Sequence, residues 1–487
     1  MTNLLNIGKT GLHASKKSLE VTGHNIANAN TEGYSRQKVN QSTNIPLTQD
    51  GLMTGTGVRV KSITRVNDKF VEKRLRDTLS NGEYYNNRAD QLGQVEEIFN
   101  EIDNDGLNKV LNRFFNSFRD LANQPDNETV RSVVRDNAML VVKDFKRIRG
   151  SLDMVSNNIN NKVERDVADI NREIESIAKL NTKIRELEAI HEETGDLRDQ
   201  RDNSIKVLSE IVKIHTYEDE RGNYNVTSPG IGTLVTAAQT QPLKAYQFDK
   251  GRSSNGVDGA TEVFYADRPG QHITNNVSKG SLEGIISVRN GEVEELKTTV
   301  DKIAYNFMNF VNAIHRRGFV GRKIPMDANG NPAGTDGKGP TTGLNFFKVP
   351  TSVRGAASNI DLSQSVKSDL SNISTALSPN SPGDNRVAIA ISKLQHERVM
   401  DDSTSTLEEM FLKTVGKVGL ESGKAKLEAE QSEGLIAQAK SIRERISGVS
   451  IDEETANMVR YQHAYEAAAK VMQTANEMFD TVISIKR

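Results

Sequence analysis

The C-terminal end of the chain carries an apolar repeat in which spacings of three and four residues alternate. The repeat consists of Met458, Tyr461, Tyr465, Ala468, Met472, Ala475, Phe479 and Val482. This spacing places the apolar side chains in one narrow seam along a helix. Gly448 precedes the segment and Ser450 can cap the N-terminus of its helix. The sequence therefore predicts a C-terminal helix that packs against another helix.

A second seam lies at the N-terminus. Leu5, Leu12, Leu19 and Ile26 recur every seven residues, and small side chains occupy the seam between them. The two end helices could pair, and each seam could instead be buried within its own domain. Chain ends are poorly ordered unless something holds them. Because each seam is also narrow, we expect both to be buried mainly on assembly with other subunits.

The first helix is expected to end in the stretch Gly23 to Gln37, "GHNIANANTEGYSRQ". Asn28 and Asn30 suit the turn, because short amides bond the freed backbone groups and tolerate left-handed conformations. Gly33 supplies a positive φ. This turn chemistry does not explain Asn25, which lies beside Ile26 on the packing side. A polar residue next to a seam can fix register and partner, so we assign Asn25 an assembly role.

The region between the ends predicts several domains, because 487 residues exceed what one core organises. Apolar positions from Leu152 to Leu187 recur at helical spacing and predict a long amphipathic helix. Alternation around Val212 to Val226 predicts a β-hairpin. Helical spacing resumes at Val293 and returns after Pro382. The predicted fold is mainly α, a long helical bundle with an inserted β-rich domain.

Three domains follow from this pattern. Residues 1–66 with 448–487 would form a terminal coiled-coil assembly domain. Residues 67–212 with 288–316 and 386–447 would form a helical shell. Residues 213–287 with 317–385 would form a β-rich outer domain with linkers, since 321–343 is rich in glycine, proline and asparagine.

Composition excludes several classes of function. The 63 basic residues nearly balance the 65 acidic ones, so the chain as a whole has no electrostatic attraction for nucleic acid. The sequence contains no cysteine, which removes disulfides, thiolate nucleophiles and Cys-ligated metals. No run of 18 apolar residues predicts a membrane span. Lys9, Lys16 and Lys17 interrupt the N-terminal segment, so no cleaved signal peptide is expected.

Candidate metal and cofactor motifs are all incomplete. His191-Glu192 and His396-Glu397 begin like zinc-protease helices but lack the second histidine four residues later. The Glu101–Gly106 and Asp327–Asn331 stretches each lack the glutamate that closes a calcium loop. Gly55 and Gly57 lack the third glycine and the helix of a dinucleotide site. We therefore predict no catalytic, metal or cofactor residue.

Two segments resemble a known family. "NIANANTEGYSRQ" (Asn25 to Gln37), with Gly33, Tyr34 and Arg36, resembles the N-terminal signature of the flagellar axial proteins, meaning rod, hook and hook-associated subunits. The Ser-Arg-Gln ending is similar to the hook-associated branch. Residues 448–485 resemble the C-terminal signature of the junction subunits in that branch. Weaker similarities lie at Asp196–Asp202, Gly355–Ile360 and Pro382–Asn385. Glu32 departs from the pattern, because many axial proteins have proline there.

The resemblance implies a structural subunit that polymerises at the distal end of the hook as an adapter to the filament. It implies export to the extracellular flagellum without cleavage of a signal peptide. It also implies terminal helices that are mobile until they order as a coiled coil on assembly. The implied partners are further copies of the chain, hook protein, a second junction protein, the filament and an export chaperone at the C-terminal helix. Nucleic acid and membrane are not among them.

Three alternatives differ in what they require. A hook or rod subunit would share the end segments and differ in the middle domains. An exported enzyme would need converging side chains in the β-rich region, where His215, Asp249 and His272 are dispersed. A coiled-coil signalling protein would need membrane spans or heptads over much of the chain, and the sequence shows neither.

Overall fold

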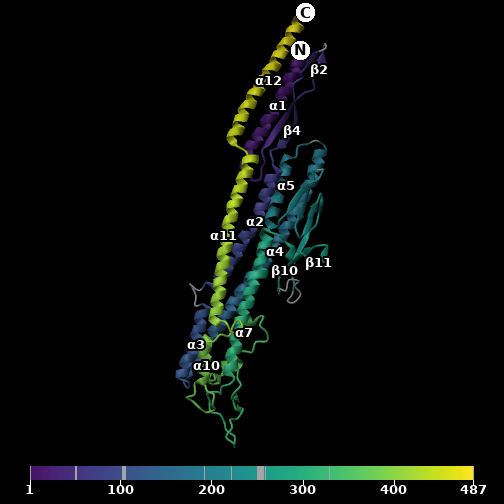
Figure 1. The fold of residues 1–487 in the computed structure, drawn as a ribbon. Helices are drawn as coiled ribbons and strands as arrows, with labels where there is room; N and C mark the ends of the chain where they lie inside the picture. Colours follow the sequence, from purple (N-terminus) through teal and green to yellow (C-terminus); the bar gives the residue numbers. More distant parts are fainter. Residues whose placement is uncertain are drawn as a thin grey trace.

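The computed structural model describes residues 2–49, 52–100, 106–190, 192–220, 222–248, 257, 259–327 and 329–485. The molecule is elongated, with both termini at one end (Figure 1). Long helices run along its length, and a group of short strands lies on the flank of α4 (Figure 1). The fold is mainly α with inserted β elements, as the sequence predicts. In the described part of the chain, no helix is long and apolar enough to cross a bilayer.

The elements follow one another along the chain with these bounds. The helices are α1 (Thr2–Ala27), α2 (Lys69–Phe99), α3 (Leu107–Asn123), α4 (Glu128–Ala189), α5 (Gly195–Ile211), α6 (Gly280–Val288), η2 (Arg289–Val293), α7 (Glu294–His315), α8 (Ala356–Asn359), α9 (Gln364–Ser368), α10 (Arg386–Lys393), α11 (Leu407–Ser447) and α12 (Ile451–Ile485), with short turns η1 (Thr274–Asn276), η3 (Leu370–Asn372) and η4 (Leu394–His396). The strands are β1 (Gln37–Thr43), β2 (Leu47–Gln49), β3 (Leu52–Thr54), β4 (Val58–Arg65), β5 (His215–Glu218), β6 (Tyr224–Ser228), β7 (Gly232–Thr236), β8 (Gln239–Thr240), β9 (Leu243–Gln247), β10 (Thr261–Tyr265), β11 (Arg268–His272), β12 (Thr335–Asp336) and β13 (Gly339–Pro340).

The spine of the molecule is α4, which extends far beyond the predicted Leu152 to Leu187 segment in the N-terminal direction. Its N-cap is Asn127, whose side chain accepts from the backbone N–H groups of Thr129 and Val130. Its core positions include Val134, Val141, Ile148, Ile159, Val163, Ile170, Ile177 and Ile184. They recur mostly at intervals of seven or four residues, so one face of the helix is buried along almost its whole length.

A cluster of phenylalanines fills the core at the end remote from the termini. Its members are Phe114, Phe115, Phe118, Phe145, Phe307, Phe346 and Phe347, all fully or almost fully buried. Many of their rings meet edge to face, as Phe114 does with Phe118 at a centroid distance of 5.1 Å. Few aromatic residues are present in the chain, and these seven of its 15 phenylalanines are concentrated here.

The strands of the middle region form two small antiparallel sheets, with orders β5-β6-β7-β8 and β11-β10-β9. The predicted hairpin corresponds to β5 and β6, where His215 is opposite Thr227. The β region is shorter than the predicted 213–287, because the helix α6 already begins at Gly280. Helix α6 continues through η2 into α7, which carries the predicted helical run from Val293.

Residues 317–385 differ most from expectation. The sequence predicts that they join the β-rich domain, yet the named strands in their described part are only β12 and β13, each of two residues, and their helices are short. They lie at the end of the molecule opposite the termini (Figure 1). Polar contacts hold them to α7, because Asn312 Oδ1 accepts from the N–H groups of Phe346 and Phe347 at 2.9 and 2.8 Å. A chain rich in turn residues satisfies its backbone here mainly through turns and loop contacts, with one two-stranded sheet of β12 and β13.

His315 is a second anchor for this loop region. Its ring is fully buried; Nδ1 donates to Leu344 O at 2.7 Å and Nε2 accepts from Ser374 N at 2.9 Å. Only a neutral ring can make both bonds. Burial lowers the pKa of His315 to about 4.

This lowered pKa predicts a pH-dependent stability. Between pH 6.5 and 4 the unfolded chain binds a proton at His315 that the folded chain excludes. The stabilisation is complete above pH 6.5 and is lost as the pH falls through this window, by roughly 3 kcal/mol. Urea unfolding at a series of pH values should show a shallower dependence in His315→Gln than in the parent chain. The exposed His463 on α12 provides the control, since His463→Gln should leave the dependence unchanged. Equal slopes for all three chains would contradict this assignment.

Candidate assembly site

The two terminal helices, α1 and α12, lie side by side within one chain (Figure 1). They approach closely through small residues. A Cβ atom added at Gly8 would lie 2.8 Å from Met472 Cγ and 3.2 Å from the Met472 backbone nitrogen. A Cβ at Gly11 would touch Ala468 at 3.4 Å. The other side of α1 packs on β1 and β4, and Gln41 of β1 donates to Ser18 Oγ at 3.0 Å.

The predicted seam residues are covered to different degrees in the single chain. Leu5, Leu12, Leu19 and Ile26 are half-buried, as are Met458, Tyr461, Tyr465, Ala468 and Met472. Ala475 is buried, whereas Phe479 and Val482 are 49% and 48% exposed. The structure pairs the two seams with each other within one chain, and burial of the remaining seam residues between subunits stays a prediction. The physical reason for the pairing is the row of small residues on α1, which lets the α12 backbone come near.

Asn25 connects three elements at the end of this helix pair. Its side chain is buried and makes every hydrogen bond that an amide can make. Asn25 Oδ1 accepts from Tyr34 Oη at 2.8 Å and from Gln37 N at 2.9 Å. Asn25 Nδ2 donates to Gln37 O at 2.9 Å and to Glu454 Oε2 at 3.1 Å. One amide thus joins α1 to the turn, to β1 and to α12.

The turn after α1 uses the other predicted residues locally. Asn28 Nδ2 donates to His24 O at 3.0 Å, which satisfies a carbonyl at the helix end. Gly33 has a φ of +83°, and Asn30 is exposed. Tyr34 is buried, and burial together with the carboxylates of Asp196, Asp199 and Glu454 raises the pKa of its hydroxyl. The hydroxyl therefore stays protonated and donates to Asn25.

Arg36 ties the turn to the junction between α11 and α12. Its guanidinium lies 2.9 Å from Glu453 Oε2 and 2.9 Å from Glu454 Oε1. Its backbone N–H donates to Ser447 O, at the end of α11, at 2.9 Å. The predicted cap is confirmed, because Ser450 Oγ accepts from Glu453 N at 3.4 Å. The turn after α1 and the start of α12 thus meet where α11 stops.

Helix α5 supplies a face of carboxylates to the same turn. Asp196 accepts from Gln37 Nε2 at 2.8 Å, and Asp199 accepts from Ser35 N at 3.1 Å. Arg65, at the end of β4, lies 2.5 Å from Asp199 and 2.9 Å from Asp202. Burial raises the pKa of the Asp199 carboxyl, an effect that Arg65 opposes. Sequence reasoning noted this segment only as a similarity. The spacing of three between the aspartates, which places them on one helix face, was the available signal.

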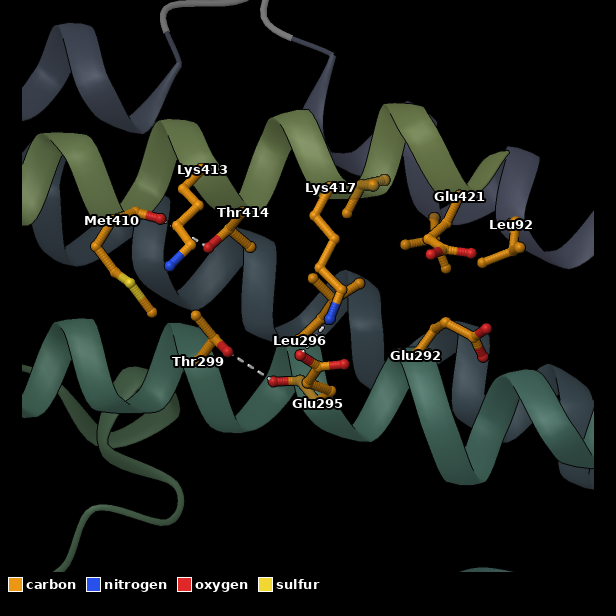
Figure 2. A pocket seen from close by; sticks show the side chains of 12 residues that line it. Leu92, Glu292, Glu295, Leu296, Thr299, Met410, Lys413, Thr414, Lys417 and Glu421 are labelled. Atoms are coloured by element: carbon orange, nitrogen blue, oxygen red, sulfur yellow. Dashed lines mark hydrogen bonds and ion pairs between the residues drawn. The ribbon is translucent and has the colours of Figure 1, made fainter. Parts of the chain in front are cut away.

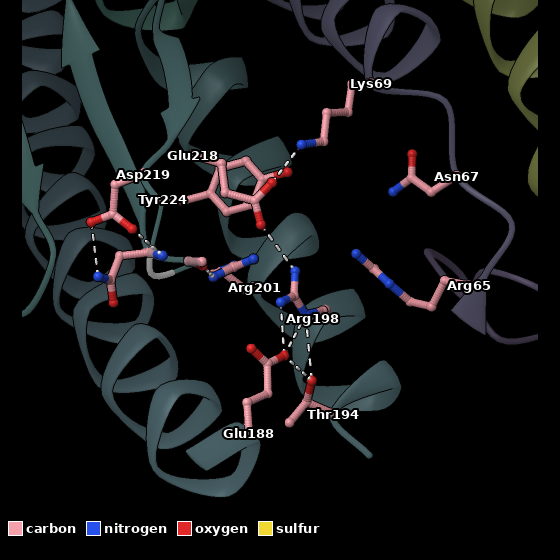
Figure 3. Close-up of polar contacts among 12 residues, drawn as sticks. Arg65, Asn67, Lys69, Glu188, Thr194, Arg198, Arg201, Glu218, Asp219 and Tyr224 are labelled. Carbon is pink, nitrogen blue, oxygen red and sulfur yellow. Dashed lines mark hydrogen bonds and ion pairs between the residues drawn. The ribbon is translucent and has the colours of Figure 1, made fainter. Parts of the chain in front are cut away.

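Two arginines of α5 face the β region (Figure 3). Arg198 binds Glu188 at the end of α4, at 2.7 Å, and Glu218 of β5 at 3.1 Å. The Arg201 guanidinium lies 4.1 Å from the ring centroid of Tyr224 on β6. Lys69, at the start of α2, pairs with Glu218 at 2.5 Å. Helix α5 therefore links the terminal region to the shell and to the sheets.

The histidines and carboxylates considered as catalytic or metal-binding residues do not form a common cluster among the described residues. His272 lies 2.5 Å from the buried Glu262, and His215 lies at the start of β5, away from that pair in sequence and sheet. No group of three or more metal-ligating side chains occurs in the described ranges. Glu101, Asp103, Asp105, His191 and Asp249 lie outside the described residues. Glu32, the departure from the family pattern, pairs with Lys206 of α5 at 2.5 Å.

The four hydrogen bonds of Asn25 predict a local stability effect. Asn25→Leu keeps the side-chain volume but leaves the backbone N–H and carbonyl of Gln37 without their partner. We expect this to lower the stability of the junction by roughly 3 kcal/mol. Hydrogen exchange in peptides from 25–40 and 448–460 should become on the order of a hundredfold faster relative to α4 peptides. Asn30→Leu, at an exposed turn position, is the control and should change neither peptide. Unchanged exchange in Asn25→Leu would show that the amide does not hold the junction.

Comparisons with known proteins agree with this arrangement. A family model described as the flagellar hook-associated protein FlgK helical domain matches residues 92–336, half of the chain. Models for the flagellar basal body rod FlgEFG protein C-terminal region and for the flagella basal body rod protein match residues 444–485 and 5–34. These two cover the segments that form α12 and α1.

Relatives and one solved structure extend the likeness over the whole chain. Flagellar hook-associated protein 1 of Bacillus subtilis is 29% identical over 99% of this chain and 97% of its own length. The protein of the same name from Salmonella typhimurium is 24% identical over 100% of both chains. The flagellar hook junction protein FlgK from Burkholderia pseudomallei has a similar fold, with a TM-score of 0.64 at 14% identity over 77% of this chain and 100% of that one. The chain belongs to the family of flagellar hook-associated proteins that contain the FlgK helical domain.

Proposed function

We propose that this chain is a structural subunit of the bacterial flagellum that polymerises at the distal end of the hook and joins the hook to the filament. Membership of the hook-associated family supports a structural role at the flagellum. The match to the helical domain supports a junction subunit over a hook or rod subunit, because the end segments alone also match rod-protein models.

The observation that carries the proposal is an uncovered apolar surface on the paired terminal helices. Val459, Met478, Phe479, Val482 and Ile483 of α12 are each about half exposed. Leu4 and Ile7 of α1 are each 37% exposed. Exposed apolar side chains in such number on one helix pair are typical of a protein interface. Neighbouring copies of the same helix pair are the partners that would cover it in a closed polymer.

The further partners follow from the same surface. Hook protein would meet one end of the polymer, and a second junction protein followed by the filament would meet the other. Before assembly the apolar side of α12 would need a cover, which supports an export chaperone bound there. The site of action would be outside the cell, at the hook-filament junction.

Phe479→Glu tests the apolar surface. Phe479 is exposed in the single chain, so the variant should fold normally, with unchanged circular dichroism and unfolding midpoint. In the polymer the carboxylate would be buried without a partner, which costs several kcal/mol. The number of filament-bearing cells should fall at least tenfold when the variant replaces the parent protein in its source bacterium. Gln473→Glu adds the same charge at an exposed polar position of α12 and should support filaments normally. Normal filaments with Phe479→Glu would count against burial of this face.

Gly8→Ala tests the close approach of α1 and α12. Its Cβ would press on the Met472 side chain and backbone, whereas a Cβ at Gly23 of the same helix would meet nothing within 4 Å. Both variants gain about 1 kcal/mol of helix propensity, so their difference isolates the contact. Gly8→Ala should lower the yield of the chain in purified hooks several-fold, and Gly23→Ala should not. Equal yields would mean that the two helices separate or shift in the polymer.

A further inference from the structure

The helical shell contains a groove between α2 and α11 that the described chain leaves open. Gly93, Asp90 and Glu97 of α2 line one side, and Leu412, Gly419 and Lys426 of α11 line the other. The volume of the groove is about 780 Å³. Glu96 on its wall pairs with Lys426 at 2.9 Å. Within the described residues, Asp90 and Glu97 make no ion pair, and both are exposed.

A second cavity, on the other side of α11, is different in kind. Its volume is about 310 Å³, and it lies between α11 and α7 (Figure 2). Lys417 of α11 reaches across its mouth to Glu295 of α7 at 2.5 Å (Figure 2). An ion pair of the chain itself thus spans this cavity, whereas Asp90 and Glu97 of the α2/α11 groove make no ion pair with any described residue.

The exposed side of α11 next to the groove carries leucines and glycines that would allow another helix to approach closely. Leu412, Leu420 and Leu427 are 48%, 71% and 55% exposed. Between them lie Gly416, Gly419 and Gly423, where an added Cβ would meet nothing within 4 Å. Each glycine in a helix costs about 1 kcal/mol relative to alanine. No contact with the described residues explains these glycines, but a helix approaching from outside would use the space.

A complementary surface lies on α4. Val133, Leu140 and Met154 are 47%, 42% and 61% exposed and are separated by multiples of seven residues, so they line one stripe. Arg147 occupies the position of the same stripe between Leu140 and Met154 and pairs with Asp144 at 2.7 Å. Lys143 and Lys146 are exposed beside the stripe. The other side of the same segment is the core face of Val134, Val141 and Ile148. We name the exposed surface, residues 133–154, the α4 outer face.

The groove lies level with the Asp153 end of the α4 outer face, on a different side of the bundle. Lys297 of α7 pairs with Asp153 of α4 at 3.2 Å, and the neighbouring Leu296 lines the cavity next to Val418 of α11. Val418 also lines the α2/α11 groove. Helix α11 packs on α2 and α7, while the core side of α4 packs on α3, α5 and α7. Their exposed faces can therefore meet only between two molecules.

We propose that the α2/α11 groove of one subunit binds the α4 outer face of a second copy of this chain. The apolar stripe of α4 lies along the leucines and glycines of α11, and Lys143 and Lys146 lie opposite Asp90 and Glu97 of the groove. Groove and face are different surfaces, so the contact is head-to-tail and repeats from copy to copy along the assembly. This inference rests on the proposed function and adds the surface through which the shells join.

Cysteine cross-linking tests the contact directly, since the chain has no cysteine of its own. A Gly419→Cys and Leu140→Cys double variant replaces the parent protein in its source bacterium, and purified hooks are treated with a short bis-maleimide. The expected result is a ladder of dimers, trimers and larger products. Each single variant should remain monomeric. Gly419→Cys with Lys179→Cys, which lies on the distal half of α4 with its side chain 73% exposed, is the control and should give no ladder.

Charge exchange gives an independent readout. Glu97→Lys or Lys143→Glu should each reduce the number of filament-bearing cells several-fold, and the two together should restore it. Glu430→Lys, exposed on α11 outside the groove lining, should have no effect. Failure of the double charge variant to recover beyond either single one would overturn the pairing.

The outcomes separate this contact from the proposed function. Cross-linked dimers of Gly419→Cys alone would show that the groove binds itself, which overturns the head-to-tail contact. A double cysteine variant present in hooks at parent levels but without a ladder would also overturn it, while the junction role stands. Absence of the parent chain from purified hooks would overturn the proposed function and the contact together.

Discussion

The buried amide of Asn25 is the interaction on which the ends of the molecule depend. An asparagine inside a packed region is tolerated only when its donors and acceptors all find partners. Here the partners come from a turn, a strand and a helix more than 400 residues away in the chain. The amide can be satisfied only when α1, β1 and α12 are all in place. Folding of the two termini is therefore coupled, although each is a simple amphipathic helix by itself.

Helix α5 extends this coupling into the rest of the chain. One of its faces binds the turn and β4 through aspartates, and the other binds α4 and β5 through arginines. Such partly buried ionic contacts add modest net stability, but they are directional and fix geometry. The phenylalanine core supplies hydrophobic stability at the far end of the bundle. The hydrophobic core and the orienting polar contacts thus lie in different parts of the molecule. The phenylalanine core lies at the end remote from the termini, and the polar contacts lie around α5.

Much of this architecture could be predicted from periodicity. The seams at the two ends, the core side of α4 and the start of the hairpin at β5 all follow spacing rules that depend on local sequence. The turn residues Asn28 and Gly33 could be predicted because their chemistry is local. The identity of Asn25 as an unusual residue was visible, but its partners were not, because Glu454 is brought near only by the tertiary fold.

The rest could not be read from local patterns, for identifiable reasons. Residues 317–385 form irregular structure that depends on side chains such as Asn312 and His315, which carry no strand or helix signal themselves. The pairing of α1 with α12 inside one chain depends on backbone approach at Gly8, and glycine spacing alone does not specify a partner. The spacing of the aspartates on α5 is clear in the sequence, but it does not predict their partners. Arg65 and Gln37 are brought next to them only by the tertiary fold.

The break between α11 and α12 has a mechanical consequence. Two long helices are separated by Gly448, Val449 and Ser450, and Gly448 has no room for a side chain, because a Cβ would lie 2.4 Å from Glu444 O. An unbroken helix would transmit every tilt of the shell rigidly to the terminal pair. Because three residues interrupt the helix, the angle between its two arms depends on the contacts of Arg36 with Ser447, Glu453 and Glu454 and not on a continuous helical backbone. A change of that angle would have to break these few contacts, and it could leave the hydrogen bonds within both helices intact.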